Sequence, residues 1–416
     1  MLAGSQPRAL KNLIGWALLG QGVYLLSQLG VLVGLARFAT PEDVGRFGYA
    51  VAIASPIIAL THLGLRFNLT TDIQQQFSYS EYVHLRAITT LVAVVSIGLV
   101  GLIVASDQSS IVIIALVALM KAAESFSDLS YGAFQKHERP ELVARSLILR
   151  GPLALVLFIL LLWTTRRPDV AFFSQFLIWS VVAFAHDHAA ATRLHEGGAT
   201  PKRSPRSLFY LAVNSLPLGL SGSLSQLSGS APKLIVGWTL GLTALGYYTA
   251  IAFVLQAGTI AIQQASQAFA SRLARRHLAG DLKTVRRILV RSALVLSAAI
   301  LLGILVSAAF GGFVLSILFG PEYENFDFLL IIFMVALLFR TFGIVLQASV
   351  ISQRRFWLTL KIRVIIVISS FALAAMGAIY MDLIGVAASV MVIAILQVFL
   401  FLPFAASAKT PIAVER

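Results

Sequence analysis

The sequence predicts an all-α, polytopic membrane protein with about twelve transmembrane helices. Hydrophobic residues make up 58% of the 416 residues and charged residues only 12%, whereas soluble domains carry about 25% charged residues. Apolar segments of about 20 residues, the length that spans a bilayer as a helix, recur along the whole chain. The chain has no cysteine, which excludes disulfides, thiolate metal sites and a cysteine nucleophile.

Apolar segments bounded by polar or charged residues define the predicted helices. In the first, Arg8 and Lys11 precede an uncharged run that is longer than the roughly 7–15-residue core of a cleaved signal peptide, so we interpret it as a transmembrane helix. The seventh is the most polar, because Ser, Gly and Pro interrupt it. The predicted helices are 13–36, 44–66, 84–105, 109–134, 142–163, 170–192, 208–229, 240–268, 288–310, 326–350, 357–380 and 383–404.

The basic residues indicate the orientation, because cytoplasmic loops of membrane proteins carry an excess of Lys and Arg. With the N-terminus inside, the cytoplasmic segments hold most of the basic residues, and both termini are expected in the cytoplasm. The net charge of +14 is therefore attributed to topology, and no nucleic-acid partner is expected. The outer segments hold only a few basic residues, which are Arg37, Arg46, Arg166, Arg167 and Lys233.

A basic connection that contains Gly and Pro, over 193–207, separates the sixth predicted helix from the seventh. It predicts an N-terminal six-helix lobe over 1–206 and a C-terminal six-helix lobe over 207–416. Short similarities between the halves, such as VGRFGYA at 44–50 and LGYYTAI at 245–251, agree with a repeat. Transporters built from repeats bind substrate at the repeat interface, so we expect a central cavity between the two lobes.

Three charged residues lie within the fourth predicted helix. Lys121, Glu124 and Asp128 are spaced by three and four residues, which places them on one helix face. A charge near the bilayer centre costs about 2.5–3.5 kcal/mol on insertion scales, so these residues are expected to face other helices or water. Two interpretations remain open: an ion-pair network that joins the fourth and fifth helices, and the polar wall of a cavity.

Two arginines lie deep in other predicted helices. Arg150 is about two turns inside the fifth helix, and Arg340 is in the middle of the tenth. A guanidinium pairs bidentately with phosphate, so both are candidates for binding an anionic substrate. The alternative is a carboxylate partner on another helix, which for Arg150 would be Glu124 or Asp128.

The first helix of each half carries polar residues. Gln21 and Gln28 share one face of the first helix, and Asn214 and Ser225 belong to the seventh. Small polar residues can simply hold helices together. Their concentration in these two helices favours two hydrated walls of one substrate-binding cavity.

No metal site and no cofactor is predicted. His186 and His188 resemble a metal-binding pair, but residues two apart on a helix point to different faces. The sequence has no phosphate-binding glycine loop, nucleophile elbow or zinc motif.

Four stretches carry a resemblance that extends over essentially the whole chain. They are GLARFATPEDVGRFGYAVAIASPI at 34–57, ESFSDLSYGAFQKHER at 124–139, AFASRLAR at 268–275 and LFGPEY at 318–323. In their order and spacing on twelve helices they resemble polysaccharide flippases of the Wzx type, in the MOP exporter superfamily. These are membrane proteins of lipopolysaccharide and exopolysaccharide biosynthesis.

The resemblance implies two six-helix lobes around a central cationic cavity, and no enzyme activity. It implies that a polyprenyl-pyrophosphate-linked oligosaccharide is flipped from the cytoplasmic to the outer leaflet of the bacterial inner membrane by alternating access. Lys121 would contact phosphate, and Glu124 and Asp128 would orient the cations. Besides this substrate and membrane lipids, the polysaccharide polymerase and the chain-length regulator are the partner proteins to expect.

Two other functions remain open. A membrane polysaccharide polymerase or ligase would need a long outer loop for catalytic residues, and the outer loops here are short. A small-molecule or drug antiporter of the MATE type would share the architecture. Drug sensitivity of a knockout without any change in its glycans would favour the antiporter.

Overall fold

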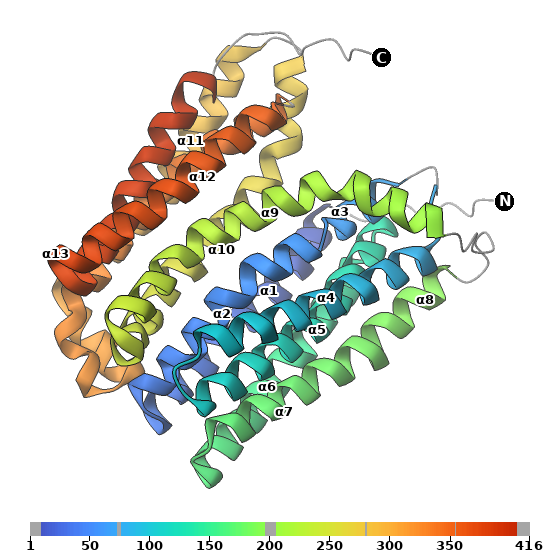
Figure 1. The fold of residues 1–416 in the computed structure, drawn as a ribbon. Coiled ribbons are helices and arrows are strands. Elements are labelled where there is room, and N and C mark those ends of the chain that lie inside the picture. The colour runs from blue at the N-terminus through green and yellow to red at the C-terminus, as the bar shows by residue number, and fades with distance from the viewer. Residues whose placement is uncertain (1–9, 73–75, 196–204, 279–280, 354, 406–416) are drawn as a thin grey trace. The chain divides into compact units, whose positions relative to one another are not determined.

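The computed structural model describes residues 10–72, 76–195, 205–278, 281–353 and 355–405, and every regular element in this part of the chain is a helix (Figure 1). Ten of these helices are long and apolar enough to cross a membrane. The polytopic all-α class is therefore confirmed. The seventh predicted segment corresponds to α9 (Pro205–Thr239), which is too polar to count among the ten. The last two predicted segments are joined in one long helix, α13 (Phe356–Ala405).

The chain divides by packing into two compact units, Met1–Gln226 and Leu227–Arg416. Helix α9 begins in the first unit and ends in the second. The predicted linker over 193–207 lies mostly outside the described residues, and the lobe boundary at residue 206 stays a prediction. The two units are described separately below.

The first unit holds the helices that position most of the predicted site residues. Its long helices follow the predicted segments closely, with ends that differ by a few residues. Its elements are α1 (Leu10–Phe38), α2 (Pro41–Thr61), α3 (Leu65–Thr71), α4 (Tyr79–Val104), α5 (Gln108–Lys136), α6 (Pro140–Thr165), α7 (Pro168–Val181), the π-helix η1 (Val182–His188), α8 (Ala189–His195) and the first part of α9 (Pro205–Thr239).

The second predicted helix, 44–66, is interrupted in the structure. Helix α2 ends at Thr61, Leu63 and Gly64 adopt left-handed backbone conformations, and the short helix α3 then begins. Glycine adopts this conformation without steric cost, so Gly64 permits the change of direction. As a result Arg66, predicted at a helix end, lies on a separate helix that packs against α4 and α5.

Helix α4 begins earlier than predicted, at Tyr79 rather than residue 84. Ser78 caps the helix: its hydroxyl accepts the backbone N–H of Glu81, and the Glu81 carboxylate accepts the backbone N–H of Ser78. This reciprocal capping box stabilises the first turn. Arg86 is consequently two turns inside the helix, where it is fully buried.

Small residues bring α1 and α6 into close contact. A Cβ atom added to Gly20 would lie 2.7 Å from the backbone of Ala144, and one added to Gly151 would lie 2.9 Å from the hydroxyl of Ser27. Such small-residue contacts are typical of membrane helices, which gain little from burying apolar surface against one another. They hold Arg150, on α6, against α1.

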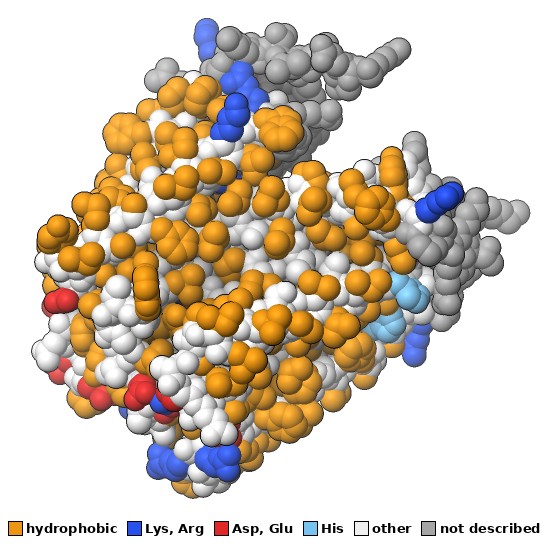
Figure 2. All heavy atoms as spheres, viewed as in Figure 1, with side chains coloured by type: hydrophobic (Ala, Val, Ile, Leu, Met, Phe, Trp, Pro, Cys, Tyr) orange, Lys and Arg blue, Asp and Glu red, His pale blue; other side chains and the backbone are white. Residues whose placement is uncertain are grey.

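The outward surface of α4 shows why these helices suit a lipid environment. Large apolar side chains along one stripe of the helix are exposed, while the opposite face is buried. Figure 2 shows hydrophobic side chains over most of the visible surface of the helices and charged side chains near the helix ends. The exposed stripe consists of Ile88, Leu91, Val92, Val95, Leu99 and Leu102.

The second unit is built from long helices. A close backbone approach of Gly377 and Gly385 brings the two halves of α13 together where Met381 and Asp382 interrupt the helical geometry. These two halves correspond to the last two predicted helices. The elements are the end of α9, α10 (Gly241–Leu278), α11 (Leu282–Phe319), the 3-10 helix η2 (Pro321–Phe326), α12 (Asp327–Ser352) and α13 (Phe356–Ala405).

Candidate functional site

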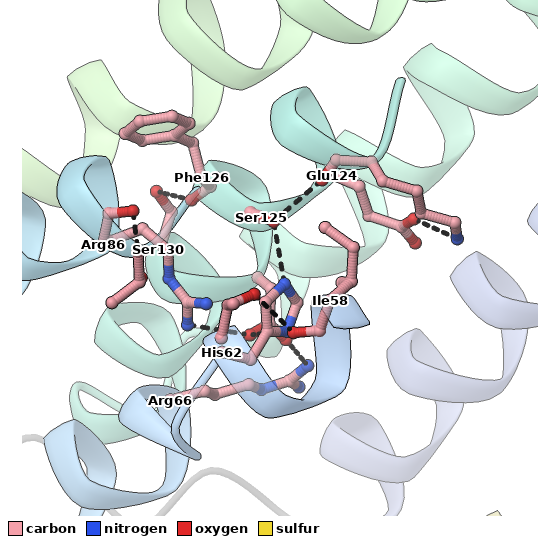
Figure 3. A network of polar contacts seen from close by, with 12 residues as sticks. Ile58, His62, Arg66, Arg86, Glu124, Ser125, Phe126 and Ser130 are labelled. Atoms are coloured by element: carbon pink, nitrogen blue, oxygen red, sulfur yellow. Dashed lines mark hydrogen bonds and ion pairs between the residues drawn. The ribbon is translucent and has the colours of Figure 1, made fainter. Parts of the chain in front are cut away.

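Charged side chains of α3, α4, α5 and α6, together with His62 directly after α2, meet beside the middle of α5. Figure 3 shows the part of this group around His62, Arg66, Arg86 and Glu124. The group combines four basic side chains, two carboxylates and one histidine. We call this group the charged network, and it consists of His62, Arg66, Arg86, Lys121, Glu124, Asp128 and Arg150.

Asp128 forms the half of the network that faces α2, α3 and α4. Its carboxylate lies 3.1 Å from Nη1 of Arg66, 3.5 Å from Nη2 of Arg86 and 3.8 Å from Nδ1 of His62. The other ring nitrogen of His62 is 2.8 Å from the hydroxyl of Ser125, one turn before Asp128. Two guanidinium groups thus share one carboxylate.

Glu124 forms the half that faces α6. It accepts a 2.7 Å hydrogen bond from Lys121 and lies 3.8 Å from Nη2 of Arg150. The guanidinium carbon of Arg150 lies 4.6 Å from the ring centre of Tyr24 and 5.0 Å from that of Trp179. The ring of Tyr131 is a third, at 5.9 Å. Stacking on aromatic rings stabilises a cation, so Arg150 is held by three rings and one carboxylate.

The network carries more positive than negative charge. Four basic side chains oppose two carboxylates, which leaves a formal charge of +2 when His62 is counted as neutral. Nε and Nη1 of both Arg86 and Arg150 are buried and have no hydrogen-bond partner among the described residues. Buried donors are normally satisfied, so these two guanidinium groups retain capacity for another acceptor.

The network is buried on one side only. Arg86 and Arg150 are 0% and 3% exposed, whereas Asp128 is 24% and Arg66 is 34% exposed. Lys121 and Glu124 are also about one quarter exposed. A charged ligand could therefore contact the accessible members, with the two buried arginines behind them.

The ion-pair interpretation of the α5 charges has a structural counterpart. The carboxylates do join α5 to its neighbours through ion pairs, and Arg150 pairs with Glu124 rather than with Asp128. The accessible faces of Lys121, Glu124 and Asp128 leave room for a ligand role. That these residues line a cavity stays a prediction.

The predicted polar residues of α1 and α9 lie outside the charged network. Gln21 and Gln28 are half-buried on α1, and Nε2 of Gln28 lacks a hydrogen-bond partner among the described residues. Asn214 and Ser225 are exposed on α9. Contact of these four residues with a substrate stays a prediction.

Arg340 lies in the second unit, on α12. It is half-buried and forms no ion pair or hydrogen bond with any residue that the structure describes. Tyr248 is the polar side chain that interacts with it electrostatically. Arg340 thus lacks the carboxylate that Arg150 has.

Sequence reasoning missed three members of the network. The predicted helices place His62 and Arg66 near the end of segment 44–66 and Arg86 near the start of segment 84–105, without a role for any of them, yet all three surround Asp128. The Ser78–Glu81 pattern, which is a capping-box sequence, could have placed the start of α4 earlier and Arg86 inside it.

A buried polar chain lies behind the network at the π-helix η1. Ser146 donates a 2.8 Å hydrogen bond to the fully buried Asp187, and Tyr131 lies 2.8 Å from the Ser146 hydroxyl. His186 contacts the other carboxylate oxygen of Asp187 at 2.8 Å. The described residues contain no group of three or more side chains that could hold a metal ion.

Comparisons with known proteins agree with this architecture. The family model described as "Polysaccharide biosynthesis protein" matches residues 10–270. The capsular polysaccharide biosynthesis protein CapF of Staphylococcus aureus is 28% identical over 348 residues, which cover 81% of this chain and 84% of CapF.

Solved structures show the same fold. An inward-facing multidrug resistance MATE family transporter of the MOP superfamily superposes with a TM-score of 0.75 at 16% identity, over 94% of this chain and 95% of the transporter. A MOP superfamily transporter from Pyrococcus furiosus gives a TM-score of 0.63 at 15% identity, over 96% of both chains. The chain is thus a multi-pass membrane protein with the fold of MOP superfamily transporters, and it belongs to the polysaccharide biosynthesis protein family.

Proposed function

We propose that the protein moves a polyprenyl-diphosphate-linked oligosaccharide from the cytoplasmic to the outer leaflet of the bacterial inner membrane by alternating access. The family match supports a role in polysaccharide biosynthesis, and the fold is one used by transporters. The observation that carries the proposal is the excess of basic side chains in the charged network, where four cations oppose two carboxylates.

A diphosphate fits this excess of positive charge. Arginine binds phosphate oxygens through two parallel N–H donors, and Arg66 is accessible enough to do so. Arg340 is a second cation that lacks a protein anion among the described residues. We assign Arg66 to the diphosphate. Since an intramembrane cation without a partner is costly, we assign Arg340 separately to an anionic group of the substrate. Arg150 and Lys121 would add positive charge that attracts the diphosphate to the network.

The direction of transport follows from the predicted topology. The loops after α3, α5 and α8 are expected in the cytoplasm together with both termini, because the basic residues concentrate there. The substrate would enter from this side and leave toward the outer leaflet. The polysaccharide polymerase and the chain-length regulator, which would act on the transported unit, are the partner proteins we propose.

A second candidate function is export of small molecules, because a MATE family transporter has the same fold. A positively charged network would suit anionic rather than cationic compounds. Loss of drug resistance without loss of surface glycan in a knockout would support this candidate.

Complementation of a flippase-deficient strain tests the proposal, with surface polysaccharide measured and membrane levels checked by blot. Wild-type protein should restore the polysaccharide. Arg340→Lys should retain part of it, since the charge remains, and Arg340→Ala should lose most of it. Arg291→Ala, an exposed arginine on α11, is the matched control and should complement fully. Full complementation by an Arg66→Ala, Arg340→Ala double variant would contradict the proposal.

A further inference from the structure

A separate pocket of about 410 Å³ opens in the first unit, at the end of α3 and the start of α4. Ligand pockets in proteins are commonly about 300–1,000 Å³, so this one has the size of a small-molecule site. Its lining includes Asn68 and Thr71 of α3, Asp72 after it, Phe77 before α4, and Asn214 of α9. None of these residues belongs to the charged network.

The pocket offers hydrogen-bonding groups that are not fully used. Asn214 makes no hydrogen bond with any described residue, so its amide can both donate and accept. Asn68 donates a 2.6 Å hydrogen bond from Nδ2 to the hydroxyl of Ser215, which leaves the oxygen of its side-chain amide, Oδ1, available. A pocket lined by amides with unused donors and acceptors can satisfy hydroxyl groups, which also both donate and accept.

Asp72 is positioned by its own loop. Its carboxylate accepts the backbone N–H of Gln76 at 2.9 Å and of Phe77 at 3.2 Å, and the Tyr82 hydroxyl lies 3.4 Å away. A carboxylate has about four acceptor positions, so one is still available. Because these contacts fix its orientation, Asp72 can hold a ligand hydroxyl without a large loss of side-chain entropy.

An aromatic group adjoins the polar lining. The ring of Phe77 lies 6.2 Å from that of Tyr82 and 6.4 Å from that of Tyr210. Tyr82 is buried, whereas Tyr210 is 60% exposed on α9. The apolar C–H face of a sugar ring packs against aromatic rings, so Phe77 and Tyr210 supply the second element of a carbohydrate site.

The charge of this pocket is opposite to that of the network. Among the residues that the structure describes, its lining contains one carboxylate and no Lys or Arg. Lys136 is near, but its ammonium donates to the backbone carbonyl of Asp72 at 2.7 Å. An anion would therefore be disfavoured here, and a neutral or amino sugar would be accepted.

The pocket and the charged network share helix α3. Arg66 belongs to the network and Thr71 to the pocket. Five residues of α-helix span about 7–8 Å along the helix axis. A ligand with a diphosphate at one end and sugars directly attached could reach both sites at once.

We propose that this pocket binds the sugar residues next to the diphosphate and so selects the glycan. The proposal rests on the proposed function, because it requires that the charged network bind a prenyl diphosphate. It adds a glycan-recognition site formed by Asn68, Thr71, Asp72, Phe77, Asn214 and Tyr210.

The test measures dissociation constants with the purified full-length protein in lipid nanodiscs. The probes are farnesyl diphosphate alone and farnesyl diphosphate that carries N-acetylglucosamine, glucose or galactose. At least one glycosylated probe should bind wild-type protein more tightly than the sugarless probe. Asn214→Ala should reduce this gain about 5-fold, the effect of about 1 kcal/mol from one hydrogen bond, and should leave the affinity for the sugarless probe unchanged.

A matched control and a second variant complete the design. Asn325→Ala removes an exposed asparagine of η2 in the second unit and should alter neither affinity. Tyr210→Ala, which removes an exposed ring, should also reduce the gain. The proposal is overturned if no sugar improves binding, or if the gain persists in both variants. If wild-type protein binds no prenyl diphosphate at all, the proposed function itself fails, and the sugar site fails with it.

Discussion

The charged network of the first unit and Arg340 of the second show two ways of keeping arginine inside a membrane protein. In the network, Arg86 shares Asp128 with Arg66, and Arg150 lies 3.8 Å from Glu124. Arg340 has Tyr248 beside it and no carboxylate partner among the described residues. The arginines of the network are thus paired with carboxylates of the protein, whereas Arg340 is paired with no carboxylate among the described residues.

The positions of the acidic residues along the chain explain why Arg340 has no carboxylate partner among the described residues of its own unit. From Leu227 onward, the chain has few carboxylates, and those that the structure describes lie at helix ends or at the interruption of α13. No acidic side chain is therefore available in the middle of the second unit's described helices. The acidic residues in question are Asp281, Glu322, Glu324, Asp327, Asp382 and Glu415. We infer that the network is a structural element with spare charge, while Arg340 depends on a ligand.

The largest effect on stability is expected from Asp128→Asn. It removes the carboxylate that Arg66 and Arg86 share, and Arg86 is fully buried. Leaving a buried charge without its partner costs about 3–5 kcal/mol, so thermal unfolding of the detergent-solubilised protein should occur at a clearly lower temperature. Asp382→Asn, at an exposed position, is the control. Equal unfolding temperatures for the two variants would mean that Asp128 does not hold the network together.

Replacing Arg86 and Arg340 by leucine, one at a time, should affect the stability of the protein differently in the two regions. Arg86→Leu should destabilise the protein, because Asp128 loses one of its cations. Arg340→Leu should leave stability unchanged or raise it by about 1 kcal/mol, since removing an uncompensated charge from an apolar environment is favourable. Thermal unfolding without ligand gives both values. A loss of stability in Arg340→Leu as large as in Arg86→Leu would show that Arg340 has a protein partner.

Glu124→Gln tests whether the net positive charge of the network determines the affinity for a diphosphate. The formal charge of the network would rise by one, because Lys121 and Arg150 keep their charges while Glu124 loses its own. Affinity for farnesyl diphosphate should increase about 3- to 10-fold, an effect of about 1 kcal/mol from one added net charge at short range. Isothermal titration measures it. Weaker binding would indicate that Glu124 positions a cation that the diphosphate needs.

The smallest effect is expected outside the membrane-spanning helices, at Asp107. Burial acts to raise its pKa, but the backbone N–H of Ser110 at 2.6 Å and the guanidinium of Arg46 at 3.0 Å outweigh burial. The pKa of Asp107 therefore lies below its ordinary value of 3.8. Its contribution to stability is fully present above about pH 4 and is lost as the pH falls through the lowered pKa.

Asp107→Asn should accordingly lower stability by less than about 1 kcal/mol, the range for exposed ion pairs. The difference in unfolding temperature from wild type should be constant between about pH 5 and pH 8 and should shrink at lower pH. Unfolding curves recorded across this range provide the measurement. A difference that grows as the pH falls would have the wrong sign for this ion pair.

The sequence predicted the helices well because each apolar segment has a length set by the bilayer. It predicted that Lys121, Glu124 and Asp128 need polar surroundings, because their cost in lipid is large. Local rules also accounted for the pairing of Lys121 with Glu124, which are three residues apart.

The partners from other helices could not be predicted in the same way. His62 and Arg66 reach Asp128 because the chain turns at Leu63 and Gly64, and apolar periodicity does not reveal such a turn. Arg86 was misplaced because the polar first turn of α4 resembles a loop. The pocket at the end of α3 could not be predicted either, because Asn214, which lines it, is more than a hundred residues along the chain from Asn68.

The most direct test of the account is the affinity of the purified protein for farnesyl diphosphate when Arg66 and Arg340 are changed one at a time. Arg66→Gln removes one charge from the network, and Arg340→Gln removes the cation of α12 that has no carboxylate partner among the described residues. A lost charged hydrogen bond is worth about 1.5–3 kcal/mol, so each variant should raise the dissociation constant about 10-fold or more. The exposed arginines Arg145 and Arg291, each changed to Gln, are the controls and should not change it. A rise of less than about 2-fold in both Arg66→Gln and Arg340→Gln would contradict the claim that these arginines bind the substrate's phosphates.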